Sequence, residues 1–217
     1  MKPMFYVFLA ITAVLATTTN SHTPVLDIDG DIIYRGSYYV LPVMRGQGGG
    51  VTLSGRGNNP CPLDIVQESS EVDVGLPVKF SNWMTKIASV PESQNLNIET
   101  DIAATICVQS TYWWLDTYDK ERKKWFVTAG PKPQGPGGDS FRSFFQIVKA
   151  GDNAYKFVFC PRDCAGSHKV CSPNCHDVGI FVDEKGVRRL ALSNKPFLVI
   201  FKKAHVTEGS KFMAITM

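Results

Sequence analysis

The chain of 217 residues has few histidines and carries no catalytic signature built on them. No serine lies in a Gly-x-Ser-x-Gly elbow, the turn that exposes a nucleophile in many hydrolases. The glycines at 48–50 lack both the Lys-Ser/Thr of a phosphate-binding loop and the third spaced glycine of a dinucleotide site. Because acyl transfer needs a nucleophile beside a base, these absences predict a binding protein that is not an enzyme and needs no cofactor.

The sequence also lacks a strong charge of either sign and a long apolar run. The formal charge is +3, and removal of Lys2 with the leader described below lowers it to +2. A chain so close to neutral is not typical of partners of nucleic acid or of anionic membranes. After the leader, no segment approaches the roughly 20 apolar residues that span a bilayer. No Asn-x-Ser/Thr sequon occurs, so we expect no N-glycosylation.

The first 21 residues have the three parts of a secretory signal peptide. A basic start is followed by an apolar run over residues 5–16 and by small polar residues that end at Ser21. A membrane anchor is the alternative, but this apolar run is short for one. We therefore predict a signal peptide over residues 1–21 and one soluble domain over 22–217, secreted to the extracellular space or to a compartment such as the vacuole.

No window of helical length shows a sustained 3.6-residue period, whereas short alternating apolar stretches separated by turn residues recur along the chain. About a dozen such strands at regular spacing favour an all-β sandwich or barrel over alternating βαβ units. The predicted strands cover residues 38–43, 51–53, 64–67, 78–80, 96–98, 111–115, 125–128, 144–148, 155–159, 178–182, 189–192 and 197–202.

Six cysteines follow the leader, an even number that indicates disulfides in a secreted chain. They are Cys61, Cys107, Cys160, Cys164, Cys171 and Cys175. Six cysteines allow fifteen pairings, although the cluster at 160–175 leaves the first two as a plausible long-range pair. The cluster also has tolerable spacing for zinc with His168 and His176, but secretion favours disulfides.

One segment near the start of the predicted domain carries a family signature. In residues 25–33 apolar residues alternate around acidic residues and Gly30, which predicts a strand that runs into a tight turn, with residues 38–43 returning as a second strand. The residue types and the spacing from Asp27 to Tyr39 resemble the N-terminal signature of the plant Kunitz-type protease inhibitors, the soybean trypsin inhibitor family. Further similar segments are 61–67, 96–98, 113–116, 125–127, 155–161, 177–180 and 188–192; residues 38–42, Cys164 and 191–193 resemble the miraculin-like branch.

This resemblance covers essentially the whole predicted domain and implies a β-trefoil, a six-stranded barrel closed by three hairpins with pseudo-threefold repetition. It implies the pairs Cys61–Cys107, Cys160–Cys175 and, nested inside the second, Cys164–Cys171. With every cysteine paired inside the chain, we expect a monomer. The implied partner is a target protease, most simply a trypsin-like serine protease. The implied role of the protein is in plant defence.

The resemblance further implies that the loop at 81–90 enters the active site of the protease. Lys86 would occupy the trypsin specificity pocket, whose buried carboxylate it complements, and Lys86–Ile87 would be the substrate-like bond. Thr85 is the alternative primary residue, because this loop is one residue longer than the soybean type. Trp83 and Met84 are bulky for an exposed loop and are candidate anchors for a partner.

One position departs from the family pattern. Family inhibitors tend to carry an asparagine that braces this loop from inside, and the corresponding residue here is Arg35. An arginine donates hydrogen bonds but cannot accept them, so the brace must differ or be absent. The second hypothesis is therefore a non-inhibitory or cysteine-protease-directed trefoil, acting as a stress, storage or ligand-binding protein, because fold alone does not fix function.

Overall fold

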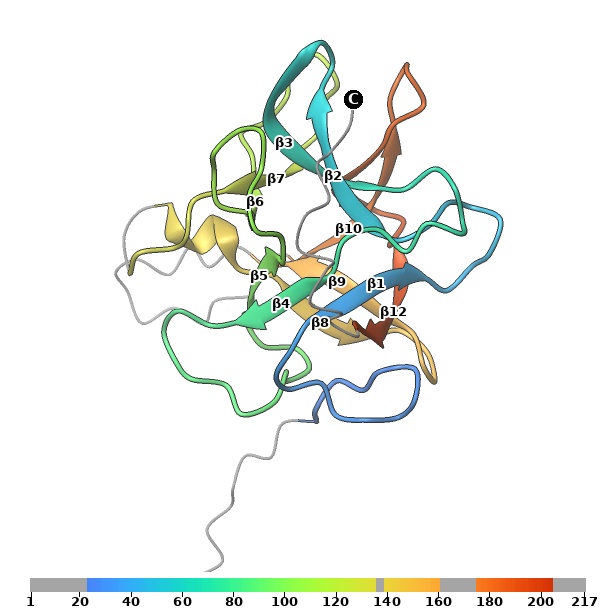
Figure 1. Cartoon of the computed structure of the whole chain (residues 1–217), viewed down its shortest axis with the longest axis vertical. Helices are drawn as coiled ribbons and strands as arrows, with labels where there is room; N and C mark the ends of the chain where they lie inside the picture. Colours follow the sequence, from blue (N-terminus) through green and yellow to red (C-terminus); the bar gives the residue numbers. More distant parts are fainter. Residues whose placement is uncertain (1–22, 136–138, 161–174, 205–217) are drawn as a thin grey trace, which may run out of the picture.

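The computed structural model describes residues 23–135, 139–160 and 175–204, and the regular secondary structure of this part of the chain is almost entirely β (Figure 1). The strands are β1 (Tyr38–Pro42), β2 (Val51–Arg56), β3 (Asn59–Gln67), β4 (Val78–Ser81), β5 (Asn97–Thr100), β6 (Tyr112–Leu115), β7 (Val127–Gly130), β8 (Gln146–Lys149), β9 (Tyr155–Phe159), β10 (His176–Val182), β11 (Arg188–Ser193) and β12 (Leu198–Lys203). A 3₁₀ helix, η1 (Ser140–Ser143), precedes β8. Every strand predicted over 38–202 is present. Among the described residues no helix has the length and apolarity that a membrane crossing needs.

Six strands close into a barrel. β1 pairs with β4 and β12, β4 pairs with β5, and β9 pairs with β8 and β12, all antiparallel. A bridge between Leu96 and Phe145, one residue ahead of β5 and β8, joins the remaining neighbours. The barrel wall is therefore continuous, and the loop between β4 and β5 leaves it at one end.

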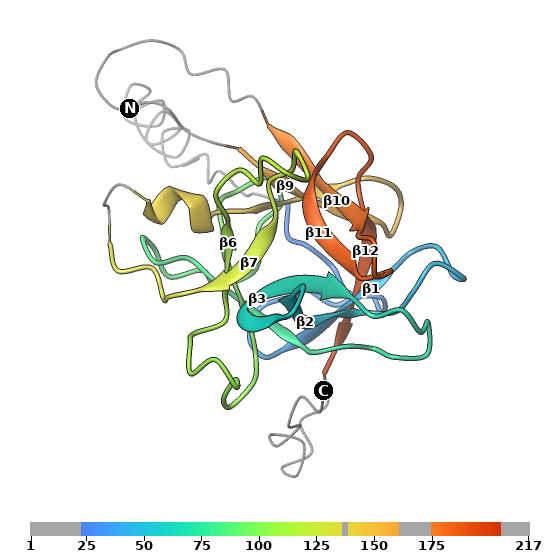
Figure 2. The ribbon, with the colours of Figure 1, turned by 90° about the horizontal axis from the view of Figure 1, so that it is seen from above.

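The other six strands form three hairpins that cap the barrel. These are β2–β3, β6–β7 and β10–β11. They also pair with one another, because β3 contacts both β7 and β11, and a bridge joins Phe126 to Ala191. Seen from above, the hairpins surround a common centre (Figure 2). The predicted β-trefoil, with its six-stranded barrel and three hairpins, is confirmed.

The core is filled by the inward-facing side chains of the barrel strands and of the hairpins that cap them. In β1 the alternation buries Tyr38 and Val40, as the period of two requires. Trp113 is fully buried, and its ring meets Phe157 and Phe145 edge-on at centroid distances of 5.2 and 6.1 Å. Such aromatic contacts add to the hydrophobic stabilisation of the core. The exposed loops are therefore attached to a closely packed core.

The predicted strand at the start of the signature, residues 25–33, is not formed. Here the carboxylate of Asp27 accepts hydrogen bonds from the backbone N–H groups of Asp29 and Asp31, both at 3.0 Å. Gly30 has φ +86°, which closes the turn. Because the side chain takes the donors that a ladder would use, only isolated bridges remain, and β1 pairs with β12 instead of returning beside this segment.

The predicted pairs Cys61–Cys107 and Cys160–Cys175 are both present. Since Cys160 and Cys175 are joined to each other, they do not offer thiolates to zinc, and within the described ranges no three His, Cys, Asp or Glu side chains form a group that could hold a metal. The predicted pair Cys164–Cys171, and the signal peptide over 1–21, lie outside the described residues.

The loop between β5 and β6 holds a valine in a strained conformation. This loop is tied to β3 by Cys61–Cys107 and projects beside the β2–β3 hairpin (Figure 2). Val108 there has φ +49° and is 95% exposed. A β-branched residue is a clear outlier in this backbone region. Because the side chain of Val108 is exposed, its burial does not compensate for the strain.

Replacement of Val108 by asparagine, which tolerates this region, is expected to raise the free energy of unfolding by about 1 kcal/mol. Chemical denaturation measures the change. The matched control is Val72→Asn, because Val72 is also highly exposed (82%) but has no positive φ. The free energy of unfolding of this variant should stay within about 0.5 kcal/mol of the parent. Equal effects of the two changes would contradict the assignment of strain to Val108.

Candidate functional site

The segment between β4 and β5, residues 82–96, forms a loop that projects from the barrel (Figure 1). It contains three consecutive exposed residues, Met84, Thr85 and Lys86, which we call its tip. Met84 is 59% exposed, the largest apolar side chain of this tip. Ile87, which follows Lys86, is half-buried and packs against the core. The loop therefore presents three consecutive side chains to solvent and turns the fourth back into the protein.

The amino-terminal half of the loop is braced by Asn97, the first residue of β5. Asn97 is 1% exposed, and its side-chain oxygen accepts a hydrogen bond from the backbone N–H of Trp83 at 2.9 Å. Its side-chain nitrogen donates to the carbonyl and the hydroxyl of Ser143, at 3.1 and 2.9 Å. Asn97 thus uses both ends of its amide to join the loop to the end of η1.

Two further asparagines continue this brace. The side chain of Asn82 accepts a hydrogen bond from the backbone N–H of Met84 and donates to the carbonyl of Asn95, both at 2.8 Å. The side chain of Asn95 accepts from Gln146 on β8 at 2.9 Å. The loop is therefore closed on itself at its base and tied to the neighbouring barrel strand.

Trp83 supports the loop from inside. Its ring stacks on Phe144 at a centroid distance of 5.8 Å and an interplanar angle of 21°. The indole nitrogen is buried and has no hydrogen-bond partner in the described part of the chain. This position does not favour Trp83 as an anchor for a partner, whereas the exposed Met84 keeps that role as a hypothesis.

The carboxyl-terminal half of the loop is held by backbone hydrogen bonds to the signature segment. The N–H of Val25 donates to the carbonyl of Val90, and the N–H of Val90 donates to the carbonyl of Ile33, both at 2.8 Å. The N–H of Glu92 donates to the carbonyl of Thr23, also at 2.8 Å. The segment that did not become a strand is therefore the clamp for this side of the loop.

Arg35 is exposed and lies outside this brace. Among the described residues, no hydrogen bond or ion pair joins Arg35 to residues 82–96. The internal support comes instead from Asn97, which sequence reasoning did not single out. The signal available in the sequence was an amide between the apolar Leu96 and Ile98, because a buried amide needs partners for both of its ends.

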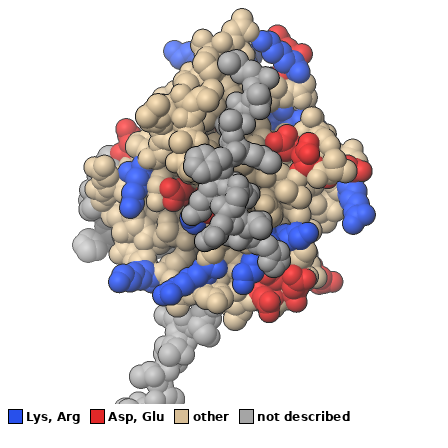
Figure 3. Space-filling model, in the orientation of Figure 1, with Lys and Arg blue, Asp and Glu red and all other residues tan. Residues whose placement is uncertain are grey.

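The site offers recognition rather than catalysis. A basic side chain stands at the exposed tip, with an anchored residue on its carboxyl side and a buried asparagine holding the chain on its amino side. On the face shown in Figure 3, basic and acidic side chains lie interspersed. An all-β trefoil that presents one braced basic loop defines the class of substrate-like protease inhibitors.

Comparison with known proteins gives the family. The chain belongs to the legume Kunitz family, described as "Trypsin and protease inhibitor", whose sequence model matches residues 25–203. It is 66% identical over 210 residues to Kunitz trypsin inhibitor 4 of Arabidopsis thaliana, covering 97% of this chain and 95% of the relative. It is 40% identical over 211 residues to miraculin of Synsepalum dulcificum (90% and 94% covered), in agreement with the resemblance to the miraculin-like branch.

A solved relative places the same fold on a protease. Soybean trypsin inhibitor, in its complex with porcine pancreatic trypsin, matches this structure with a TM-score of 0.68 and 32% identity, covering 84% of this chain and 100% of that one. The family resemblance inferred from residues 25–33 and the later segments is thereby confirmed.

Removal of the brace is expected to turn the loop into a better substrate. Asn97→Ala leaves the partly buried N–H of Trp83 without its acceptor, so we expect a stability loss of roughly 1–3 kcal/mol. The looser loop must be ordered on binding, which should weaken trypsin inhibition about tenfold. Chemical denaturation measures the loss of stability, and inhibition kinetics together with mass spectrometry of the loop measure the weaker inhibition and the cleavage. Asn153→Ala, at an exposed position on the β8–β9 turn, should change neither, and unchanged inhibition by Asn97→Ala would contradict the brace.

Proposed function

We propose that the mature chain inhibits a trypsin-like serine protease by placing Lys86 in the specificity pocket and Lys86–Ile87 across the catalytic serine. The single observation that carries this proposal is the exposed Lys86 between two independently anchored halves of one loop. A lysine supplies the charge that the acidic floor of a trypsin-like pocket requires. Thr85 and Ile87 would contact the protease on either side of it, and Met84 would add apolar contact.

Rigidity explains why such a loop inhibits instead of being digested. A loop already held in its bound shape loses little conformational entropy on docking. If the protease cuts Lys86–Ile87, the new ends stay in place, because Asn97 holds the amino-terminal side and the packed Ile87 holds the other. Two groups kept together at high effective concentration favour re-formation of the bond. Cleavage is therefore reversible, and the complex persists.

The location follows from the leader and the disulfides. We propose that residues 1–21 direct the chain into the secretory pathway and are removed, and that the domain over 22–217 acts outside the cell or in the vacuole. The bonds Cys61–Cys107 and Cys160–Cys175 fit an oxidising compartment. In this account the protein is a monomeric inhibitor whose partner is a protease, with neither nucleic acid nor membrane required.

A panel of proteases tests the proposal. Purified protein of residues 22–217 would be titrated against trypsin, chymotrypsin, subtilisin and papain, with the active sites of each enzyme counted beforehand. We expect stoichiometric inhibition of trypsin and weaker inhibition of the others, since only trypsin carries an acidic pocket floor. Inhibition of papain alone would replace this proposal with the cysteine-protease hypothesis, and inhibition of none would favour a non-inhibitory trefoil.

A further inference from the structure

A pocket of about 330 Å³ lies between the end of β1, strand β10 and the start of β12. Its apolar lining includes Pro42, Ile180, Phe197 and Leu198. The volume is at the lower end of the range for small-molecule sites, roughly 300–1,000 Å³. None of the residues that line it belongs to the loop at 82–96, so it is a second surface with its own chemistry.

The charged side chains of this pocket are all of one sign. Arg188 and Lys195 line it, and no Asp or Glu is among its lining residues. Within the described ranges, no carboxylate forms an ion pair with either of these two cations. The pocket therefore combines an apolar wall with uncompensated positive charge.

Arg188 is held in place by a buried amide. Its Nε donates to the side-chain oxygen of Gln67 at 2.9 Å, and the nitrogen of the same amide donates to the carbonyl of Gly49 at 3.0 Å. Gln67 is only 3% exposed. A guanidinium fixed through one N–H keeps others for a ligand, and its planar fork matches a carboxylate. The cation is thus positioned before any ligand arrives.

We propose that this pocket binds a small amphipathic anion, an aryl or branched-alkyl carboxylate. The apolar body would lie against Ile180, Phe197 and Leu198, and the carboxylate would face Arg188 and Lys195. A neutral molecule of the same shape would forgo the charge-assisted hydrogen bonds. A fully solvated anion such as phosphate would gain nothing from the apolar wall. The site therefore selects for both properties in one ligand.

The test compares 1-naphthoate with its neutral analogue 1-naphthalenemethanol, using calorimetry for affinity and ¹H–¹⁵N NMR for location. We expect 1-naphthoate to shift the amide signals of Ile180, Phe197 and Leu198. The neutral analogue should bind about tenfold more weakly, the difference that one charge-assisted hydrogen bond supplies. Higher salt should weaken 1-naphthoate binding, because Lys195 is exposed.

Variants separate the site from general surface charge. Lys195→Gln should weaken 1-naphthoate binding about fivefold, and Arg188→Gln should weaken it about tenfold or more. The matched control is Lys185→Gln, an exposed lysine on the neighbouring β10–β11 turn that does not line the pocket, and it should leave affinity unchanged. Equal binding of the neutral analogue, shifts confined to other residues, or unchanged affinity in Lys195→Gln would overturn the proposal. So would a lack of binding at millimolar ligand.

Discussion

Lys86→Ala is expected to weaken trypsin binding by roughly 30-fold to several-thousand-fold. The buried carboxylate of the protease pocket would lose its partner, and loss of one side of a buried charge pair costs about 2–5 kcal/mol. The fold should be unaffected, because Lys86 is exposed on a loop outside the barrel strands. The inhibition constant against trypsin, measured beside the thermal midpoint, gives both quantities.

Two companion variants sharpen this result. Lys86→Leu should shift preference toward chymotrypsin, whose pocket is apolar. Lys149→Ala, at an exposed lysine at the end of β8, should inhibit trypsin as the parent does. If Lys86→Ala inhibits as well as the parent, Lys86 is not the primary residue. Thr85→Ala would then show whether the contact lies one position earlier.

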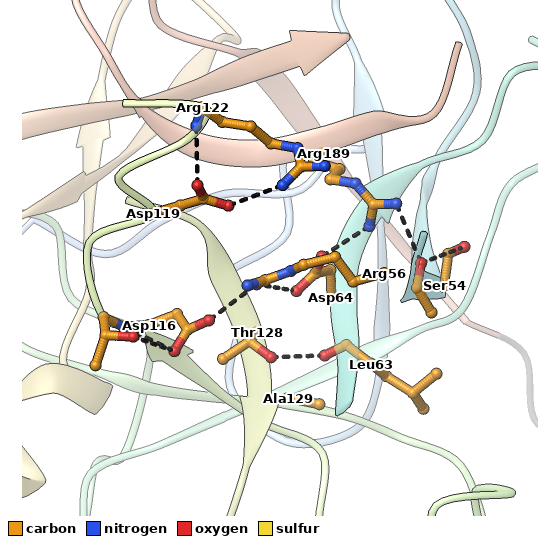
Figure 4. A network of polar contacts seen from close by, with 12 residues as sticks. Ser54, Arg56, Leu63, Asp64, Asp116, Asp119, Arg122, Thr128, Ala129 and Arg189 are labelled. Atoms are coloured by element: carbon orange, nitrogen blue, oxygen red, sulfur yellow. Dashed lines mark hydrogen bonds and ion pairs between the residues drawn. The ribbon is translucent and has the colours of Figure 1, made fainter. Parts of the chain in front are cut away.

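Asp64→Ala is expected to destabilise the fold by roughly 3–5 kcal/mol, because the buried guanidinium of Arg189 and the partly exposed one of Arg56 each lose one of their two carboxylate partners. Asp64 on β3 is completely buried. It accepts hydrogen bonds from Arg56 at 2.6 and 2.9 Å and from Arg189 at 2.7 Å (Figure 4). Arg56 also pairs with Asp116 beyond β6, so the cluster joins all three hairpins.

The pKa values in this cluster reflect the same contacts. The hydrogen bond to Asp64 holds the pKa of Arg56 above its ordinary range, although burial opposes the charge. Burial would raise the pKa of Asp183, but hydrogen bonds from the backbone of Val187 and from Arg189 hold it below its ordinary value. The hydrogen bond to Asp64 thus favours the charged form of Arg56, which contributes to the cost of removing Asp64.

A matched pair of variants checks the origin of this cost in chemical denaturation. Asp116→Ala removes a carboxylate that is 25% exposed and should cost no more than about 1 kcal/mol. Replacement of Arg56, Asp64 and Arg189 together by apolar residues of similar volume should restore part of the stability lost in Asp64→Ala, since the buried Asp64–Arg189 pair is then absent and Asp183 keeps its hydrogen bonds from the backbone N–H groups of Lys185 and Val187. A loss below about 1 kcal/mol for Asp64→Ala alone would show that the cluster does not hold the hairpins together.

The strands could be predicted because each carries its own period-two pattern. Tyr38 and Val40 of β1 face the core, as the alternation indicates. The pairing of Asp64 with Arg189 could not be predicted in this way, because the two residues are 125 positions apart and only the closed cap brings them together. The helix η1 could not be predicted from its own sequence either, because it depends on a distant contact. Ser143 at its end accepts hydrogen bonds from Asn97 of β5.

The candidate loop shows the same division. The sequence indicated an exposed basic residue in an irregular segment, and Lys86 lies at the tip of such a loop. The support of the loop depends on tertiary contacts: the sequence indicated only that the brace must differ or be absent with Arg35 in place, whereas in the structure Asn97 and the backbone of residues 23–33 hold the loop. Strand propensity also failed over residues 25–33, because a side chain there competes for the backbone donors.

The central claim is that Lys86–Ile87 is presented to a trypsin-like protease as a bond that is cut and re-formed in place. The most direct measurement is prolonged incubation of the mature protein with a catalytic amount of trypsin. The reaction is then quenched with acid and examined by mass spectrometry and N-terminal sequencing. The account predicts one new terminus at Ile87, a mixture of intact and cut chains that stops changing with time, and full inhibitory activity in that mixture. Complete digestion, or a cut elsewhere while Lys86–Ile87 stays intact, would contradict it.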